Sequence, residues 1–550
     1  MGVEELLHIL NDVLGTDVQI SDPGVRDCLE YFVRESSTDD GLLEGAHSLT
    51  DGLRLVHPIH PMDFGQAYAY WRMVKHDRFE DFIRTLEVRR AADGAMRHDP
   101  VEGTYIKNAL LPPRRVWDLF SNRVIPFYLI DTHDTDYIPG NIQTVSHSWC
   151  HPQNRHSVET PINGYQWPVP IPIIADNAHA PEHSDDMALL ERVRVELLNV
   201  GVEYAWLDVL CIRQKGLQEH EALRVEEWKT DIPMIGRIYA ADRHCVTYFN
   251  GLGLPLQLDD DTLRSETHWL NRVWTLQEGT YYWLPGGVTD TVLGSEDART
   301  FFQETIKSSM TRDHTAAVAA IQKRHCTTEL DRVHGLAYVI GCKSLPIYDP
   351  DMTPDDAWVL LLKHLRPDAR QFIAVMHTQW NPDSTSFLPS FEELKMYGTR
   401  PGPDAWDTWM CDGISSIGEL HQGERRPGTY IHKAQLLGEL SVSQPWPGGD
   451  CLPSLNISFT TDTDKYRIYG RYLPDIKYRV ISLCLQGSLV VEVLGETVIH
   501  GEIAQKVIKR GCIHWNSYIP EAPIREDDEK ELVVYVPDTD AERAVYNIYE

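Results

Sequence analysis

The chain has 550 residues, of which 42% are hydrophobic and 24% charged, proportions typical of globular proteins with large cores. Its formal net charge of −31 repels phosphate backbones and anionic lipids, so we expect neither nucleic-acid nor membrane binding. The ten cysteines form no CxxC pair and no segment is apolar enough to span a bilayer, so we predict a cytoplasmic protein with reduced thiols.

The first part of the chain, residues 1–110, has the pattern of a helical extension. Apolar residues up to Leu14 recur at helical spacing, and Gly15 is a typical C-terminal stop. A second helical segment is expected after Asp63, a good N-cap, and reaches Leu86. Nothing here indicates site chemistry, so we predict an extension that packs on the next domain.

Residues 111–345 alternate between strand and helix patterns. Strands are predicted within NIQTVSHSW, EYAWLDVLCI and HCVTYFNG, which are short apolar runs. Helices are predicted within DMALLERVRVELLNVG, EEWKTDIPMIGRIYAA and HWLNRVWTLQE. In the second helix, Pro233 should lie in the first turn or cause a kink. This order predicts an α/β domain with a doubly wound parallel sheet.

Residues 346–550 change in character. A helix is predicted within PDDAWVLLLKHL, and a region rich in Pro, Asp and Gly follows it. Short β-type runs then occur at Tyr466–Leu473, Tyr478–Leu485, Ser488–Leu494 and Leu532–Val536. We predict an α+β accessory domain, partly antiparallel β, as the third of three domains: 1–110, 111–345 and 346–550.

Polar and aromatic side chains follow the predicted strands or lie in the helix after the third one. Ligands of doubly wound sheets bind at the carboxyl ends of the strands, so we expect these side chains to converge. The candidates are Ser146, His147, Trp149, Asp208, Arg213, Arg272, Trp274 and Glu278.

These segments also carry a resemblance. TVSHSW, YAWLDVLCIRQ, MIGRIYAAD leading into VTYFNG, and NRVWTLQE resemble, in order, the motifs of the fungal HET (heterokaryon incompatibility) domain. ELDRVHGLAYVIG resembles the segment that follows that domain, and the match covers Arg115 to Gly341. Cys150 stands where the family usually has glycine, and Arg213 where it has asparagine. The HET domain is in turn similar to the TIR domain, which implies a TIR-like, flavodoxin-like core.

The resemblance assigns roles to the candidates. WTLQE looks like the TIR helix motif whose glutamate serves the cleavage of NAD between nicotinamide and ribose, which implies Glu278 as the catalytic carboxylate. NAD is then a substrate, and no cofactor is expected. Trp149 or Trp274 would stack on a base and Arg272 or Arg213 would hold phosphate. Such a hydrolase would act in heterokaryon incompatibility and programmed cell death.

Two other functions fit the same residues. One is a non-enzymatic signalling module that works by self-association or through protein partners. The other is a metabolic enzyme that acts on another small molecule in the same cleft. Glu278 is also compatible with a surface or capping role, and the tryptophans with core packing. Ser146 and His147 are adjacent in a strand and point to opposite faces, so we do not expect a nucleophile–base pair.

A metal site is the remaining alternative. Six possible ligands cluster along the chain: His147, Cys150, His151, His156, His179 and His183. Histidine and cysteine are zinc ligands, but this spacing fits no compact template. We therefore predict no metal.

Overall fold

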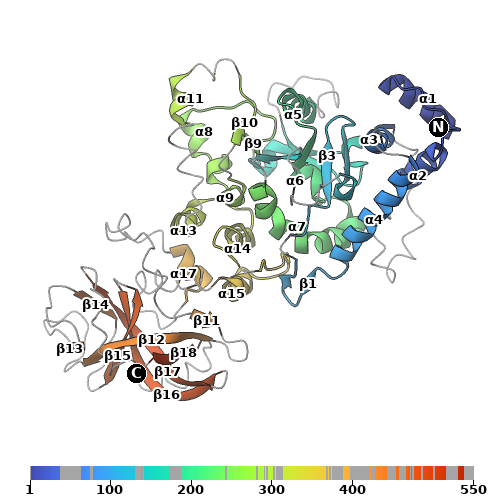
Figure 1. Cartoon of the computed structure of the whole chain (residues 1–550). Helices are drawn as coiled ribbons and strands as arrows, with labels where there is room; N and C mark the ends of the chain where they lie inside the picture. The colour runs from blue at the N-terminus through green and yellow to red at the C-terminus, as the bar shows by residue number, and fades with distance from the viewer. Residues whose placement is uncertain are drawn as a thin grey trace. The chain divides into compact units, whose positions relative to one another are not determined.

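The computed structural model describes residues 2–37, 64–74, 79–108, 110–130, 138, 142–173, 188–241, 245–279, 283–289, 292, 295–301, 304, 314–342, 344–366, 369–370, 373, 388–396, 420–422, 428–441, 454–457, 466–470, 472, 476–484, 487–499, 502–515 and 531–537. The chain divides into two compact units (Figure 1). Unit 1 is Met1–Val339 with Ser344–Thr353, and unit 2 is Ile340–Lys343 with Pro354–Glu550. The finer division into three domains stays a prediction.

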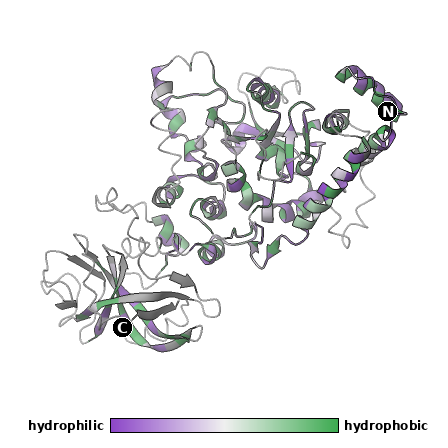
Figure 2. Cartoon of the chain, in the orientation of Figure 1, coloured by the Kyte–Doolittle hydropathy of each residue, from purple (hydrophilic) through white to green (hydrophobic). Residues whose placement is uncertain are grey.

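Unit 1 begins with four helices. They are α1 (Val3–Leu14), α2 (Val25–Ser37), α3 (Phe64–Val74) and α4 (Phe79–His98). The predicted stop of the first helix is confirmed, because Gly15 caps α1 with a left-handed φ of 64°. Hydrophobic and hydrophilic residues alternate around these helices (Figure 2), and Phe32 packs against Tyr70, Trp71 and Phe82. Asp63, the predicted N-cap, lies outside the described residues.

A six-stranded sheet forms the core of unit 1, in the order β10-β9-β5-β8-β3-β4. Its strands are β3 (Arg115–Asp118), β4 (Arg123–Pro126), β5 (Ile142–His147), β8 (Tyr204–Leu207), β9 (Cys245–Tyr248) and β10 (Trp283–Pro285). β5, β8 and β9 run parallel, as predicted, and β10, which was not predicted, is parallel to β9. β3 is antiparallel to both β8 and β4. The α/β class is confirmed, but the sheet is mixed, because a short connection joins β3 to β4 and allows only antiparallel pairing.

Helices connect the parallel strands. α5 (Ala188–Asn199) precedes β8, and α7 (Glu221–Ala241) precedes β9. In Figure 1 they lie on either side of these strands, where Glu196 of α5 accepts from Tyr248 and Tyr239 of α7 donates to the Val145 carbonyl. Pro233 lies well inside α7 and not in its first turn, so of the two predicted alternatives only the kink remains.

Two predicted elements differ from the structure. The second strand ends at Leu207, because Asp208 begins the helical turn α6 (Asp208–Cys211) and accepts from the Val209 amide at 2.7 Å. The third predicted helix is wrong: it consists of the 3-10 turn η7 (Trp269–Asn271) and the single turn α9 (Thr275–Glu278). Between them, the chain exchanges backbone hydrogen bonds with His325 instead of with its own next turn.

The smaller elements of unit 1 surround this core. The short strands are β1 (Val101–Glu102), β2 (Tyr105–Ile106), β6 (Arg155–Val158) and β7 (Val169–Pro172). Among the described residues, the helices are α8 (Asp260–Arg264), α11 (Glu296–Thr300), α13 (His314–Lys323) and α14 (Glu329–Ala337). The 3-10 turns are η2 (Phe127–Leu129), η3 (Pro152–Asn154), η4 (Pro161–Asn163) and η6 (Gln218–His220).

The described part of unit 2 comprises helices and a second sheet. The helices are α15 (Pro354–His364), as predicted, and α17 (Phe391–Met396). The strands are β11 (Leu420–Gln422), β12 (Gly428–Ser441), β13 (Ser454–Ile457), β14 (Tyr466–Gly470), β15 (Lys477–Cys484), β16 (Gly487–Ile499), β17 (Glu502–Trp515) and β18 (Glu531–Pro537). Their pairing is antiparallel except between β17 and β18. β14, β15, β16 and β18 correspond to the four predicted runs, and the other strands were not predicted.

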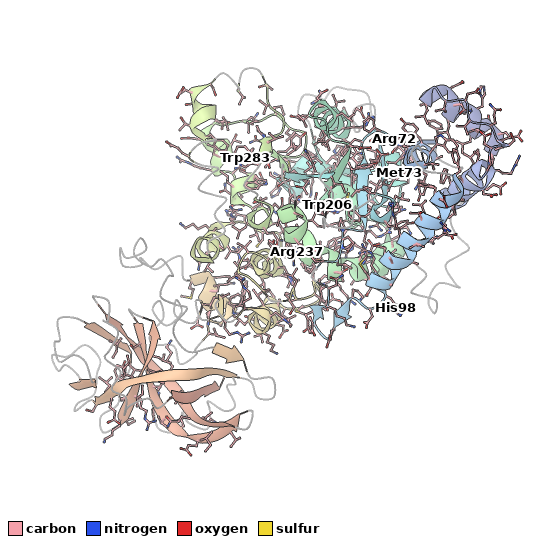
Figure 3. The ribbon with its side chains drawn as sticks, in the orientation of Figure 1. Arg72, Met73, His98, Trp206, Arg237 and Trp283 are labelled. Atoms are coloured by element: carbon pink, nitrogen blue, oxygen red, sulfur yellow. The ribbon has the colours of Figure 1, made fainter. Side chains whose placement is uncertain are left out.

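Arg72 joins the N-terminal helices to the sheet. Its guanidinium donates to Asp118 of β3 and to Glu203, each at 2.5 Å, and lies 4.3 Å from the Phe120 ring centre. Figure 3 labels Arg72 and its neighbour Met73 where α3 meets the sheet. Because Asp118 is completely buried, it depends on this arginine for its counter-charge.

We expect Arg72→Ala to destabilise unit 1 by about 3–5 kcal/mol, because it leaves the Asp118 carboxylate buried without a cation. The amides of α3 should then exchange faster with solvent. Urea denaturation and hydrogen exchange measure both effects. Arg84→Ala is the matched control, since Arg84 pairs with Asp81 on α4 but is 78% exposed. Equal stability of the two variants would contradict the expectation.

Candidate functional site

Ser146 joins the central strand β5 to the segment that carries Glu278. The Ser146 hydroxyl is buried, donates to Glu278 Oε2 at 2.5 Å and accepts from Trp269 Nε1 at 2.6 Å. The Trp269 ring packs edge-on against Phe249, which follows β9. One serine thus positions the carboxyl group of α9 at the carboxyl end of β5.

The Glu278 carboxyl is buried. Its side chain is 9% exposed and forms no ion pair among the described residues. Oε1 has no hydrogen-bond partner among these residues. Burial raises the pKa of Glu278 to about 7, and the Asp208 charge adds to this rise. The Ser146 hydrogen bond, His147 and Arg324 oppose it.

His147 points away from Ser146 and pairs with Asp208. His147 Nε2 lies 2.8 Å from Asp208 Oδ1, and Nδ1 lies 3.2 Å from the Ser148 carbonyl oxygen. Burial disfavours the imidazolium, but the charge and hydrogen bond of Asp208, with smaller contributions from Glu278 and the Ser148 carbonyl, together outweigh burial and raise the pKa of His147. Both ring nitrogens face acceptors, which fits a protonated ring. As expected, Ser146 and His147 do not bond to each other.

Trp149 contacts both His147 and Asp208. Its Nε1 donates to Asp208 Oδ2 at 3.2 Å, and its ring stacks on His147 with centroids 5.8 Å apart. The guanidinium of Arg155, the first residue of β6, lies 5.0 Å from the Trp149 ring centre. Asp208 therefore fixes both the histidine and the tryptophan at the strand ends.

Arg324 holds the segment between η7 and α9. Its Nη1 donates to Thr275 Oγ1 at 2.8 Å and to the Arg272 carbonyl at 3.1 Å. Burial lowers the pKa of Arg324 to about 10, and the charge of Glu278 partly offsets this effect. Sequence reasoning missed Arg324, Arg155 and Trp269. Only Trp269 had a local signal, since it precedes the NRVWTLQE motif.

Arg213 and Trp274 have other surroundings. The Arg213 side chain is 1% exposed, and its Nε lies 3.5 Å from Glu227 Oε2. Burial alone would raise the pKa of Glu227, but Arg115 and Arg213 hold it at about 2. Trp274 lies against Tyr348, with ring centroids 6.3 Å apart. Arg213 therefore pairs with Glu227, and Trp274 contributes to packing against Tyr348.

The His- and Cys-rich segment is described only in part, because His179 and His183 lie outside the described residues. Within the described ranges, no group of three or more His, Cys, Asp or Glu side chains is arranged to hold a metal ion. The predicted absence of a metal stays a prediction.

No family model, curated protein or solved structure matches this chain. In the part of the chain that the structure describes, no helix combines the length and apolar character that crossing a membrane requires.

We expect Glu278→Gln to stabilise the protein at pH 8 and to leave its stability nearly unchanged at pH 5. The folded state binds the Glu278 proton more tightly than the unfolded chain does, so stability falls as pH rises from about 4.5 to about 7. This pKa difference corresponds to roughly 3 kcal/mol, which the uncharged glutamine avoids. Thermal unfolding at the two pH values measures the effect, and a pH-independent difference would contradict it.

Proposed function

We propose that unit 1 contains a TIR-like domain of the HET type that hydrolyses NAD at the nicotinamide–ribose bond. The ordered resemblance of the four segments supports this proposal. So does the order of the parallel strands, β8-β5-β9-β10, which corresponds to 2-1-3-4 in chain order. Flavodoxin-like sheets have this order. They bind ligands at the carboxyl ends of the first and third strands, where the strand order reverses, and here these are the ends of β5 and β9.

The observation that carries the proposal is the hydrogen bonding of the two Glu278 carboxyl oxygens. Ser146 fixes Oε2 at the carboxyl end of the central strand, whereas Oε1 has no hydrogen-bond partner among the described residues. A structural glutamate would be expected to use both oxygens or to pair with a cation. A carboxyl group that is held through one oxygen and leaves the other without a described partner is suited to contact a substrate.

The reaction needs a carboxylate but no acid. Breaking the bond between ribose C1′ and the nicotinamide nitrogen sends the electron pair to the pyridinium ring, which leaves as neutral nicotinamide. C1′ develops oxocarbenium character, which the Glu278 carboxylate stabilises. Water then attacks C1′ and releases a proton, giving ADP-ribose. A pKa near 7 makes Glu278 a better acceptor for this proton than an ordinary glutamate.

The biological setting of the proposal rests on the resemblance alone. It comprises a cytoplasmic protein of non-self recognition and programmed cell death that self-associates or binds protein partners. NAD is the substrate, so no resident cofactor is required.

We expect Glu278→Gln to lower kcat/KM for nicotinamide release from NAD by about 100-fold or more, because the amide cannot stabilise positive charge or accept a proton. Chromatography of free nicotinamide measures the rate. Glu266→Gln is the matched control, since the Glu266 side chain is 75% exposed. Turnover by the Glu278 variant at the wild-type rate would refute the catalytic assignment.

In the wild type, activity should rise with pH through about 7 as Glu278 ionises. Ser146→Ala should move this rise to higher pH, because the lost hydrogen bond lowers the pKa of Glu278 in the wild type. A pH–rate profile measures the shift. Ser148→Ala, which removes a hydroxyl bonded to the Thr267 carbonyl, should leave the profile in place. An unmoved rise in the Ser146 variant would exclude this positioning role.

A further inference from the structure

Arg155 is a half-buried arginine that forms no ion pair with a carboxylate of the described residues. It is the first residue of β6, and its guanidinium lies 5.0 Å from the centre of the Trp149 ring. An arginine that is partly removed from water and has no anionic partner is an unfavourable arrangement, because its charge loses hydration without compensation. This arrangement makes Arg155 a candidate for contact with an anionic ligand.

The charges of the side chains around Trp149 do not cancel. His147 Nε2 lies 2.8 Å from Asp208 Oδ1 and its Nδ1 lies 3.2 Å from the Ser148 carbonyl oxygen, an arrangement that fits a protonated ring. Among the described residues, Asp208 is the carboxylate that this group contacts, and its charge is matched by His147. The guanidinium of Arg155 therefore adds a positive charge that these contacts leave unbalanced.

The contact with Trp149 orients the Arg155 guanidinium without using its hydrogen-bond donors. A guanidinium over an aromatic ring interacts through its flat face, and its N–H groups point outward in its own plane. Trp149 is itself held, because its Nε1 donates to Asp208 at 3.2 Å and its ring stacks on His147. The donors of Arg155 are thus pre-organised, which reduces the entropy lost when a ligand binds.

The segment from Ser148 to Arg155 crosses the carboxyl ends of two parallel strands. The Ser148 amide donates to the carbonyl of Tyr248, the last residue of β9, at 3.1 Å. Cys150 Sγ lies 2.8 Å from the position that a Cβ atom on Gly251 would occupy, and the φ of Gly251 is 131°. Glycine therefore allows the segment to lie against the end of β9, at the edge where doubly wound sheets bind ligands.

We propose that Arg155 binds a phosphate group of a nucleotide that lies across the carboxyl end of β5 with its ribosyl bond at Glu278. A guanidinium can donate paired hydrogen bonds to two phosphate oxygens, and its charge matches theirs. The last two residues of β5 connect the two parts of the site, since Ser146 bonds to Glu278 and His147 stacks on Trp149. The nature of the nucleotide rests on the proposed function, whereas the phosphate contact rests on Arg155.

This assignment replaces the phosphate contacts predicted for Arg213 and Arg272. Arg213 Nε lies 3.5 Å from Glu227 Oε2, and Arg272 donates to the Thr327 hydroxyl and has the Asp331 carboxylate as a charge neighbour. An acidic neighbour repels an incoming phosphate and already compensates part of the arginine charge.

Calorimetric titration with ADP-ribose tests the contact without any turnover. We expect Arg155→Ala to weaken the binding of ADP-ribose by about tenfold or more, because charge-assisted hydrogen bonds are lost. Arg155→Lys, which keeps the charge but not the planar fork, should weaken it several-fold. Adenosine, which has no phosphate, should bind the variants and the wild type equally. Arg224→Lys is the matched control, since the Arg224 guanidinium also lies over a tryptophan ring, that of Trp228, but is bonded to the Glu221 carboxylate.

Wild-type protein that binds ADP-ribose no more tightly than adenosine would overturn the inference. So would an Arg155→Ala variant with native circular dichroism and unchanged affinity for ADP-ribose. Should the alanine variant lose its native circular dichroism, unchanged affinity of Arg155→Lys would overturn the inference in its place. Arg155-dependent binding of ADP-ribose without nicotinamide release from NAD would support the inference and refute the proposed function. Nicotinamide release with an unchanged KM for NAD in Arg155→Ala would do the reverse.

Discussion

The hydrogen bond from Ser146 to Glu278 connects the central strand to a segment that cannot be stable by itself. α9 is a single helical turn, and an isolated turn does not compensate the entropy of its own formation. Its position depends on the serine, on the Arg324 side chain and on the backbone bonds to His325. The location of the Glu278 carboxyl is thus a property of the tertiary structure.

Strand geometry then separates two electrostatic environments at the end of β5. Adjacent residues point to opposite faces, so Ser146 meets a carboxyl without a cationic partner and His147 meets the Asp208 carboxylate. The pairing of Asp208 keeps a negative charge near Glu278, which raises the pKa of Glu278 beyond the effect of burial. Two carboxyl groups close together therefore have different properties, an arrangement typical of sites that move protons or stabilise cations.

The sequence predicts elements whose apolar pattern is complete within one segment. α5, α7 and β5 are of this kind, since each buries a face that its own residues define. Residues 268–278 have an equally good helical pattern, but their backbone partners lie at residue 325, which no local pattern reveals. In unit 2, β17 carries Lys509 and Arg510 among its apolar residues, and these charges obscure the strand alternation.

The arginines show that the residues of the site, too, can be predicted from the sequence only in part. Arg213 follows a parallel strand, where phosphate-binding side chains are expected. However, it forms an ion pair with Glu227 of the next helix. Arg155 lies in an unremarkable polar stretch, and only the folded chain brings it to Trp149. Whether an arginine is available for a ligand depends on which carboxylates are nearby, and that is decided by tertiary contacts.

The arrangement carries a cost in the free protein. At neutral pH, Glu278 loses hydration when it ionises. Natural proteins keep groups of unfavourable free energy at sites where a bound ligand lowers that free energy. Elsewhere in the fold, buried pairs such as Arg115 with Glu227 stabilise the structure around the site.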